Sequence, residues 1–278
     1  MSFNLSLAHL TVLDATPPQV VEVARAAGFA RVGLRLNPAR LGEAPHPMKP
    51  GSPMLRETLA RLKGLDVVVD DVEIIRIKPD FSVDHYAAVL ESAQQLGARL
   101  LMVNVDDPDM NRAAQNIGKL ADRAQAHRLL VGVEFMMYTA ARSLSLARQL
   151  VAGSGHSAVH IIIDALHFFR SGASVADLGA DVGAGASEIL RKHVQINDAP
   201  TSRHPGLSAG EEGRAHRLFP GEGELPLAEL LKQIDFNAVL SVEAPSAIRS
   251  STMTPSARAQ LAYTTTKEFL NQNGYECA

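Results

Sequence analysis

Short apolar runs alternate along this chain with segments whose apolar residues recur every three to four positions. The runs are rich in Val, Ile and Leu, which is typical of strands that are buried on both faces. The segments between them have the periodicity of amphipathic helices. Helices are expected, for example, at 54–63, 143–151, 175–182, 226–233 and 255–270. Strands are expected at 3–8, 31–36, 67–77, 99–105, 129–133, 159–163, 190–196 and 238–242.

This alternation predicts a parallel sheet, because consecutive parallel strands need a crossover connection and a helix usually provides it. Eight such units in 278 residues fit one α/β domain, 1–278, folded as a single (β/α)8 TIM barrel. An open doubly wound sheet usually has a glycine-rich loop after its first strand, and the segment 14–18 has no glycine. Two long irregular stretches, 37–53 and 197–224, are expected to be loops, and we expect the second to close over a substrate.

Composition and charge narrow the class of protein. Hydrophobic residues make up 46% of the chain and charged residues 21%, which is typical of a globular protein. The net charge is −3 and no Lys/Arg-rich stretch occurs, so neither a nucleic acid nor a membrane is an expected partner. No signal peptide or membrane span is recognisable, and the single Cys277 cannot form an internal disulfide, so a cytoplasmic location is expected. The sequence is also compatible with a homo-oligomer.

Polar side chains end four successive late strands. They are Glu134, Asp164, Gln195 and Glu243. In a barrel they would converge at the C-terminal mouth, where three carboxylates repel one another unless a cation compensates their charge. Because all the donors are oxygens, one divalent cation of the Mg²⁺ or Mn²⁺ type is expected rather than Zn²⁺. Each residue alone could instead form a surface salt bridge or cap a helix.

The chain resembles the sugar phosphate isomerase/epimerase superfamily, the xylose-isomerase-like TIM barrels of the AP endonuclease 2 type. The resemblance covers nearly the whole chain and is strongest from 129 to 245. It rests on the strand-end set, on Asp164-Ala-Leu-His167, and on Arg217-Leu-Phe-Pro220-Gly221-Glu222-Gly223. It implies that the four strand-end residues bind one metal and that Arg217 binds substrate oxygens. Many epimerases have His at the position of Gln195, whereas some dehydratases resemble this chain in using Gln.

The resemblance implies proton abstraction next to a carbonyl through a metal-stabilised enediolate, with Glu134 and Glu243 as the acid and base. Reprotonation would make the protein an isomerase or epimerase of a small polyol or keto-sugar. Loss of a β-hydroxyl would make it a dehydratase, a lyase acting on a cyclic hydroxy-ketone such as 3-dehydroshikimate or an inosose, with His167 as a candidate acid. An endonuclease would need a His cluster and a basic groove, which the late strand ends do not provide.

Other polar residues are weaker candidates for the site. His167 could contact the substrate or orient a metal ligand. Glu73, near the end of the third strand, is either a substrate-binding residue or a solvated carboxylate. Asp198 either orients a ligand or caps a loop, and His9 is expected to have a packing role.

Overall fold

A closed ring of parallel strands forms the centre of the molecule. The computed structural model describes residues 2–38, 44–179 and 189–278. The ring closes because β1 (Ser2–Leu7) pairs with both β8 (Val239–Val242) and β2 (Arg31–Arg35). The remaining barrel strands are β3 (Val68–Ile77), β4 (Leu100–Val105), β5 (Leu130–Glu134), β6 (Val159–Asp164) and β7 (Ile189–Ile196). The predicted (β/α)8 TIM barrel is therefore confirmed.

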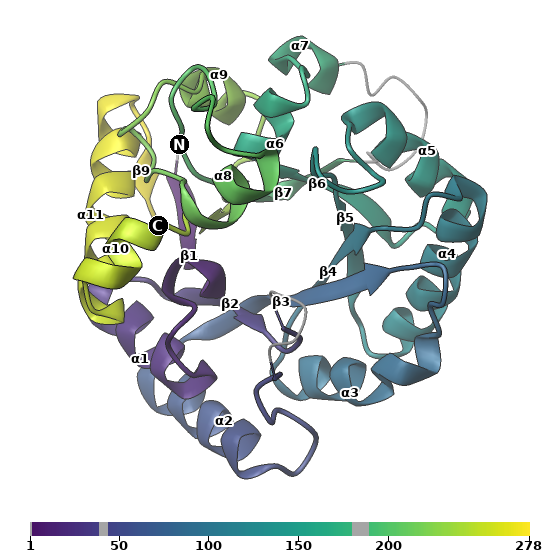
Figure 1. The fold of residues 1–278 in the computed structure, drawn as a ribbon. Helices are drawn as coiled ribbons and strands as arrows, with labels where there is room; N and C mark the ends of the chain where they lie inside the picture. Colours follow the sequence, from purple (N-terminus) through teal and green to yellow (C-terminus); the bar gives the residue numbers. More distant parts are fainter. Residues whose placement is uncertain (1, 39–43, 180–188) are drawn as a thin grey trace.

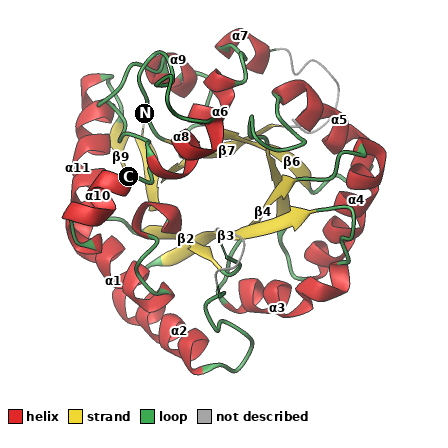
Figure 2. Cartoon of the chain, in the orientation of Figure 1, coloured by secondary structure: helices red, strands yellow, loops and turns green. Residues whose placement is uncertain are grey.

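Helices surround the ring on all sides, as Figures 1 and 2 show. Their caps follow from the sequence: Ser52, for example, accepts a hydrogen bond from the backbone of Leu55, and Pro53 stands at the first helical position. The helices are α1 (Pro17–Ala27), α2 (Pro53–Leu65), α3 (Ala87–Gln95), α4 (Met110–Ala126), α5 (Leu144–Ser154), α6 (Ala165–Arg170), α7 (Val175–Leu178), α8 (Ala209–Ala215), α9 (Leu227–Leu231), α10 (Ala247–Thr252) and α11 (Pro255–Gln272). Short 3₁₀ turns occur at His9–Val12 (η1) and Val83–Tyr86 (η2).

The main apolar core lies between the ring and the helices. In α4, for instance, Ala113, Ile117 and Leu120 are fully buried on one face. The inside of the barrel is different, because its apolar cluster is small and contains the buried residues Leu100, Met102 and Ile162. Polar side chains line the inside elsewhere, and this lining leads up to the site described below.

Several elements differ from the sequence-based expectation. Helix α2 continues past Gly64 to Leu65 and ends where Asp66 adopts a left-handed conformation with φ 52°. The stretch 197–224 is not simply a loop, because it contains α8. A ninth strand, β9 (Glu276–Cys277), pairs with β1. The helix expected at 175–182 is seen as α7, and its last residues lie outside the described part of the chain.

No helix among the described residues combines the length and the apolar character that crossing a membrane requires.

Candidate active site

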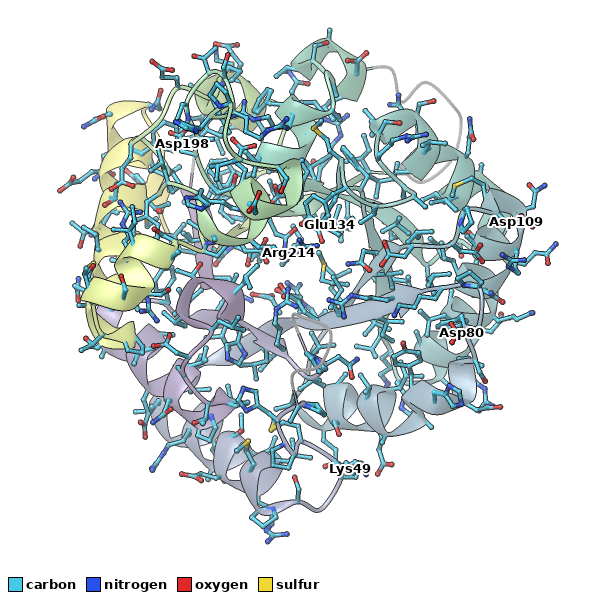
Figure 3. The ribbon with its side chains drawn as sticks, viewed as in Figure 1. Lys49, Asp80, Asp109, Glu134, Asp198 and Arg214 are labelled. Atoms are coloured by element: carbon cyan, nitrogen blue, oxygen red, sulfur yellow. The ribbon has the colours of Figure 1, made fainter. Side chains whose placement is uncertain are left out.

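Three carboxylates from different strands meet inside the mouth of the barrel. Glu134 and Asp164 are the last residues of β5 and β6, and Glu243 directly follows β8. One oxygen of each lies within 4.8 Å of the others, and all three side chains are buried. Figure 3 shows Glu134 near the middle of the ring. The barrel topology thus brings together Glu134 and Glu243, which are 109 positions apart in the sequence (243 − 134).

Gln195 is the fourth of the predicted metal ligands. It is the direct neighbour of Asp164 in the pairing of β6 with β7, and its side chain is 2% exposed. Its Oε1 atom has no hydrogen-bond partner among the described residues. A buried oxygen without a partner is costly, so the position favours a ligand that the oxygen could bind. Three carboxylates, with an amide on the strand paired to Asp164, are the kind of oxygen donors that a hard divalent cation prefers.

Asp164 is held in place by two neutral donors. Its Oδ1 accepts a hydrogen bond of 3.0 Å from the backbone of His167, so it also caps α6. Its Oδ2 accepts one of 2.8 Å from Nδ2 of Asn197, whose own Oδ1 accepts from the backbone of Leu166. The side chain is therefore fixed before any ligand binds, which favours a binding role.

Arg217 supplies the positive charge of this cluster. Its Nη1 donates to Asp164 at 2.7 Å and to the carboxylate of Glu243 at 3.0 Å, and its Nε donates to the Gly213 carbonyl at 2.6 Å. The residue is only 2% exposed. Burial alone would lower the pKa of Arg217, but the carboxylates of Asp164 and Glu243 raise it above its ordinary value. Arg217 is thus an internal partner of the proposed metal ligands.

His167 lies behind Arg217 and acts as an acceptor. Its Nε2 lies 3.1 Å from Nη2 of Arg217, and a guanidinium can only donate, so the proton of the neutral ring is on Nδ1. Burial lowers the pKa of His167 to about 4, although Asp164 opposes the shift. The ring of Tyr138 packs against it edge-on, with centroids 5.5 Å apart. In this arrangement His167 orients Arg217.

The carboxylates differ in how well their charge is matched. Despite its burial, Asp164 has a lowered pKa because Arg217 lies against it. Burial and then the charges of Glu243 and Asp164 raise the pKa of Glu134 well above its ordinary value. Burial and then Glu73 raise the pKa of Glu243 to about 8. One guanidinium therefore cannot compensate all of this negative charge, and a cation would remove the remaining repulsion.

A cavity of about 90 Å³ opens directly over the cluster. Its wall includes Glu134, Glu243 and Arg217, but among the described residues that line it neither His167 nor Glu73 occurs. Glu73 is 2% exposed, so it is not a solvated loop residue. Its Oε2 forms an ion pair of 2.8 Å with Arg35, although the geometry is not that of a good hydrogen bond.

Sequence reasoning missed several residues of the site. Asn197 follows Gln195 by two positions, so the alternation along β7 could have placed both on the inner face. Arg35 and Arg76 stand near the ends of β2 and β3, where the strand-end rule that found the carboxylates also applies. Arg214 lies on α8, a helix that was not predicted.

Comparison with known proteins identifies the family of this closed (β/α)8 barrel with buried carboxylates at its strand ends. A model described as "xylose isomerase-like TIM barrel" matches residues 21–267, so the chain belongs to that family. Its sequence matches no curated protein.

Solved structures share the fold at low sequence identity. One titled as the IolI protein with a bound zinc atom has 17% identity and a TM-score of 0.79, over 98% of this chain and 99% of that one. A probable 3-DHS dehydratase, AsbF of Bacillus anthracis, has 15% identity and a TM-score of 0.71, over 95% and 98%. An L-ribulose 3-epimerase has 16% identity and a TM-score of 0.70, over 99% and 96%. At such identities the likeness concerns the fold alone.

Proposed function

We propose that the protein is a divalent-metal-dependent enzyme that removes a proton next to a substrate carbonyl. The observation that carries this proposal is the cluster of Glu134, Asp164 and Glu243, in which one oxygen of each residue lies within 4.8 Å of the others, with Gln195 paired to Asp164 on the neighbouring strand. These four residues would hold the cation, with Mg²⁺ or Mn²⁺ preferred because every donor is an oxygen. When bound, the cation polarises the substrate carbonyl and stabilises the negative charge that develops on its oxygen.

The residues in and around the cluster have different roles in the proposed reaction. Glu134 and Glu243 both reach the cavity wall, so one can accept the proton and the other can return it from a different side. Asn197 and the backbone of His167 hold Asp164. His167 keeps Arg217 in place, and Arg217 presents its charge to the cavity, where it can bind a substrate oxygen.

Return of the proton would make the protein a sugar isomerase or epimerase, and L-ribulose 3-epimerase and D-psicose 3-epimerase are among the structures with a similar fold. A second candidate is a metal-dependent dehydratase of a cyclic hydroxy-ketone, in which the charge expels a β-hydroxyl instead. Gln195 supports this candidate, because an amide stands where a His ligand is expected in many epimerases. The structure of a probable 3-DHS dehydratase is also among the similar folds.

The direct test is metal binding by the variants Asp164→Ala and Asp164→Asn. Calorimetric titration with Mn²⁺ should give one site in the wild type and a much weaker one in both variants, because a charged ligand is lost. The Asn variant keeps an oxygen that can cap α6, so it controls for misfolding. Asp107→Asn is a matched control: Asp107 is also buried at a strand end and paired with an arginine, Arg112, but lies outside the cluster.

Unchanged Mn²⁺ affinity in both Asp164 variants would refute the site. The reaction itself can then be sought by screening the Mn²⁺-loaded protein against keto-sugars, inososes and 3-dehydroshikimate. Addition of a chelator should abolish any activity that is found.

A further inference from the structure

The wall of the cavity carries three arginines besides Arg217. Its cationic side chains are Arg35, Arg76, Arg214 and Arg217, and its carboxylates are Asp106, Glu134 and Glu243. Two of the arginines have buried partners, since Arg217 contacts Asp164 and Glu243, and Arg35 pairs with Glu73. Arg76 and Arg214 line the same cavity, and neither is needed to hold a cation.

Arg214 is held at the mouth by an aromatic ring. Its guanidinium carbon lies 4.4 Å from the centre of the Tyr138 ring, which is a cation–π contact. Within 2–38, 44–179 and 189–278 it forms no ion pair. Figure 3 shows Arg214 and Glu134 over the interior of the ring, and both line the cavity. The side chain is therefore placed over the cavity while its hydrogen-bonding edge remains available.

Arg76 approaches the same cavity from β3. Its Nη1 donates to the carbonyl of Pro38 at 3.0 Å. Burial lowers the pKa of Arg76, and the nearby charges of Arg35 and Arg214 lower it further, while Asp106 opposes the shift. Three guanidinium groups thus surround one small space and repel one another. An anion placed between them would remove this repulsion.

We propose that the substrate carries an anionic group, a carboxylate or a phosphate, which Arg214 and Arg76 bind at the cavity mouth. The inference rests on the proposed function of the site and adds the chemical class of its substrate. Guanidinium groups suit these anions because their planar donors match carboxylate and phosphate oxygens, and such charge-assisted bonds are stronger than bonds to hydroxyls. A neutral ketose would offer Arg214 no group of opposite charge to bind.

This substrate class bears on the choice between the two reactions. A cyclic hydroxy-ketone that also carries a carboxylate has both parts that the site would recognise: oxygens for the cation, and an anion for the arginines. A simple neutral sugar has the first part only. The arginines therefore favour an acidic substrate, either a hydroxy-acid or a sugar phosphate.

The test uses three ring polyols of similar size as probes: neutral myo-inositol, the carboxylate quinate and myo-inositol 1-phosphate. Their affinities are measured by calorimetry, in the full-length protein with Mn²⁺ and again with a chelator. We expect at least one anionic probe to bind more tightly than myo-inositol. Arg214→Ala should weaken that probe by about 10- to 100-fold, which corresponds to one charge-assisted hydrogen bond, and should leave myo-inositol unchanged.

Matched variants separate charge at the mouth from charge in general. Arg214→Lys keeps the charge and should retain part of the preference, and Arg76→Ala should lose affinity for the same probe. Arg123→Ala removes one positive charge from the outer surface of α4, where the side chain pairs with Asp84, and should have no effect. Mn²⁺ titrations of all variants run in parallel and test the metal site separately.

The outcomes are distinct. A preference for quinate identifies the anion as a carboxylate, and a preference for the inositol phosphate identifies it as a phosphate. Equal affinity for the three probes, including no measurable binding of any, would overturn the inference. So would a preference that survives in both Arg214→Ala and Arg76→Ala. Anion binding without Mn²⁺ binding would instead refute the metal-dependent function and leave the anion site standing.

Discussion

Asp164 accepts hydrogen bonds from the backbone of His167 and from Asn197 while one of its oxygens lies in the carboxylate cluster. The sequence allowed two interpretations of this residue, a helix cap and a metal ligand. The structure shows that the cap is real and that it leaves the residue in the cluster, because a carboxylate has enough lone pairs for several partners. At the scale of single residues, a structural role therefore does not argue against a functional one.

Glu243→Gln should separate metal binding from catalysis. The amide keeps a neutral oxygen next to the cluster, so Mn²⁺ binding should weaken but persist, whereas proton transfer is lost. With the substrate found by the screen, kcat should fall by about 10²- to 10⁴-fold, the usual contribution of a general base. Steady-state kinetics at saturating Mn²⁺ measures this effect.

Glu222→Gln is the control for that experiment, because Glu222 is a partly exposed carboxylate paired with Arg249 outside the cavity. Its kcat should stay close to that of the wild type. If Glu243→Gln also turned over normally, the two-carboxylate mechanism would be wrong, and Glu134 alone or another base would have to transfer the proton.

At the scale of elements, the segment 197–224 departs most from what the sequence indicates. The Asp198 carboxylate accepts hydrogen bonds from the backbone of Gly221, Gly223 and Leu225, at 3.0, 2.9 and 3.1 Å. Gly223 is required there, since an added Cβ would lie 2.5 Å from Asp198 Oδ1. Asp198 is thus a loop cap, the second of its two expected roles, and it ties the end of the segment to the end of β7. This clamp restricts any lid movement to residues between the clamp and α8.

Asp198→Ala should release this clamp. Losing charge-assisted hydrogen bonds costs about 1.5–3 kcal/mol, so local opening should become roughly 10- to 100-fold more populated. Trypsin should then cut faster after Arg203, which mass spectrometry of the fragments can follow. Asp109→Ala, which removes an exposed cap of α4, is the control and should not change cleavage at Arg203. Equal cleavage in both variants would mean that the Arg170–Glu212 ion pair holds the segment instead.

Buried strands and long amphipathic helices were predictable because their apolar residues repeat with a clear period. Helix α8 was not, since its sequence Ala-Gly-Glu-Glu-Gly-Arg-Ala contains two glycines and reads as a loop. The structure explains one of them: a Cβ on Gly213 would lie 3.0 Å from His167 and 3.1 Å from Tyr138. The glycine is there for close packing, which no local pattern reveals.

At the scale of the whole molecule, closure of the barrel is what turns separate strand ends into one site. The rule that strand ends meet at the mouth was sufficient to predict Glu134, Asp164 and Glu243 as a cluster. It could not place Arg217 among them, because long side chains on loops reach in directions that the sequence does not specify. Nor did it reveal the polar interior, where Oδ1 of the buried Asp71 lies 3.5 Å from Nε2 of the buried His193 and neither atom has a hydrogen-bond partner in the described part of the chain.

This concentration of buried charge should reduce the stability of the metal-free barrel, and Glu134→Gln tests that cost. The pKa of Glu134 is raised in the folded protein, so the wild type loses stability as pH rises above the ordinary value of 4.5. In a chelator at pH 8 the variant should therefore be more stable than the wild type by about 1–3 kcal/mol. Each kcal/mol corresponds to a Tm that is higher by roughly 2–4 °C. The difference between the two proteins should shrink at pH 5.

Mn²⁺ should reverse the order of the two proteins. A cation at 100 times its Kd stabilises the wild type by about 2.7 kcal/mol, whereas the variant, with one charged ligand fewer, should gain much less. Thermal unfolding of both proteins with chelator and with Mn²⁺, at pH 5 and pH 8, measures the four differences. A variant that is less stable than the wild type in chelator at pH 8 would show that Glu134 is held by favourable contacts. The carboxylates would then stabilise the mouth of the barrel even without a metal.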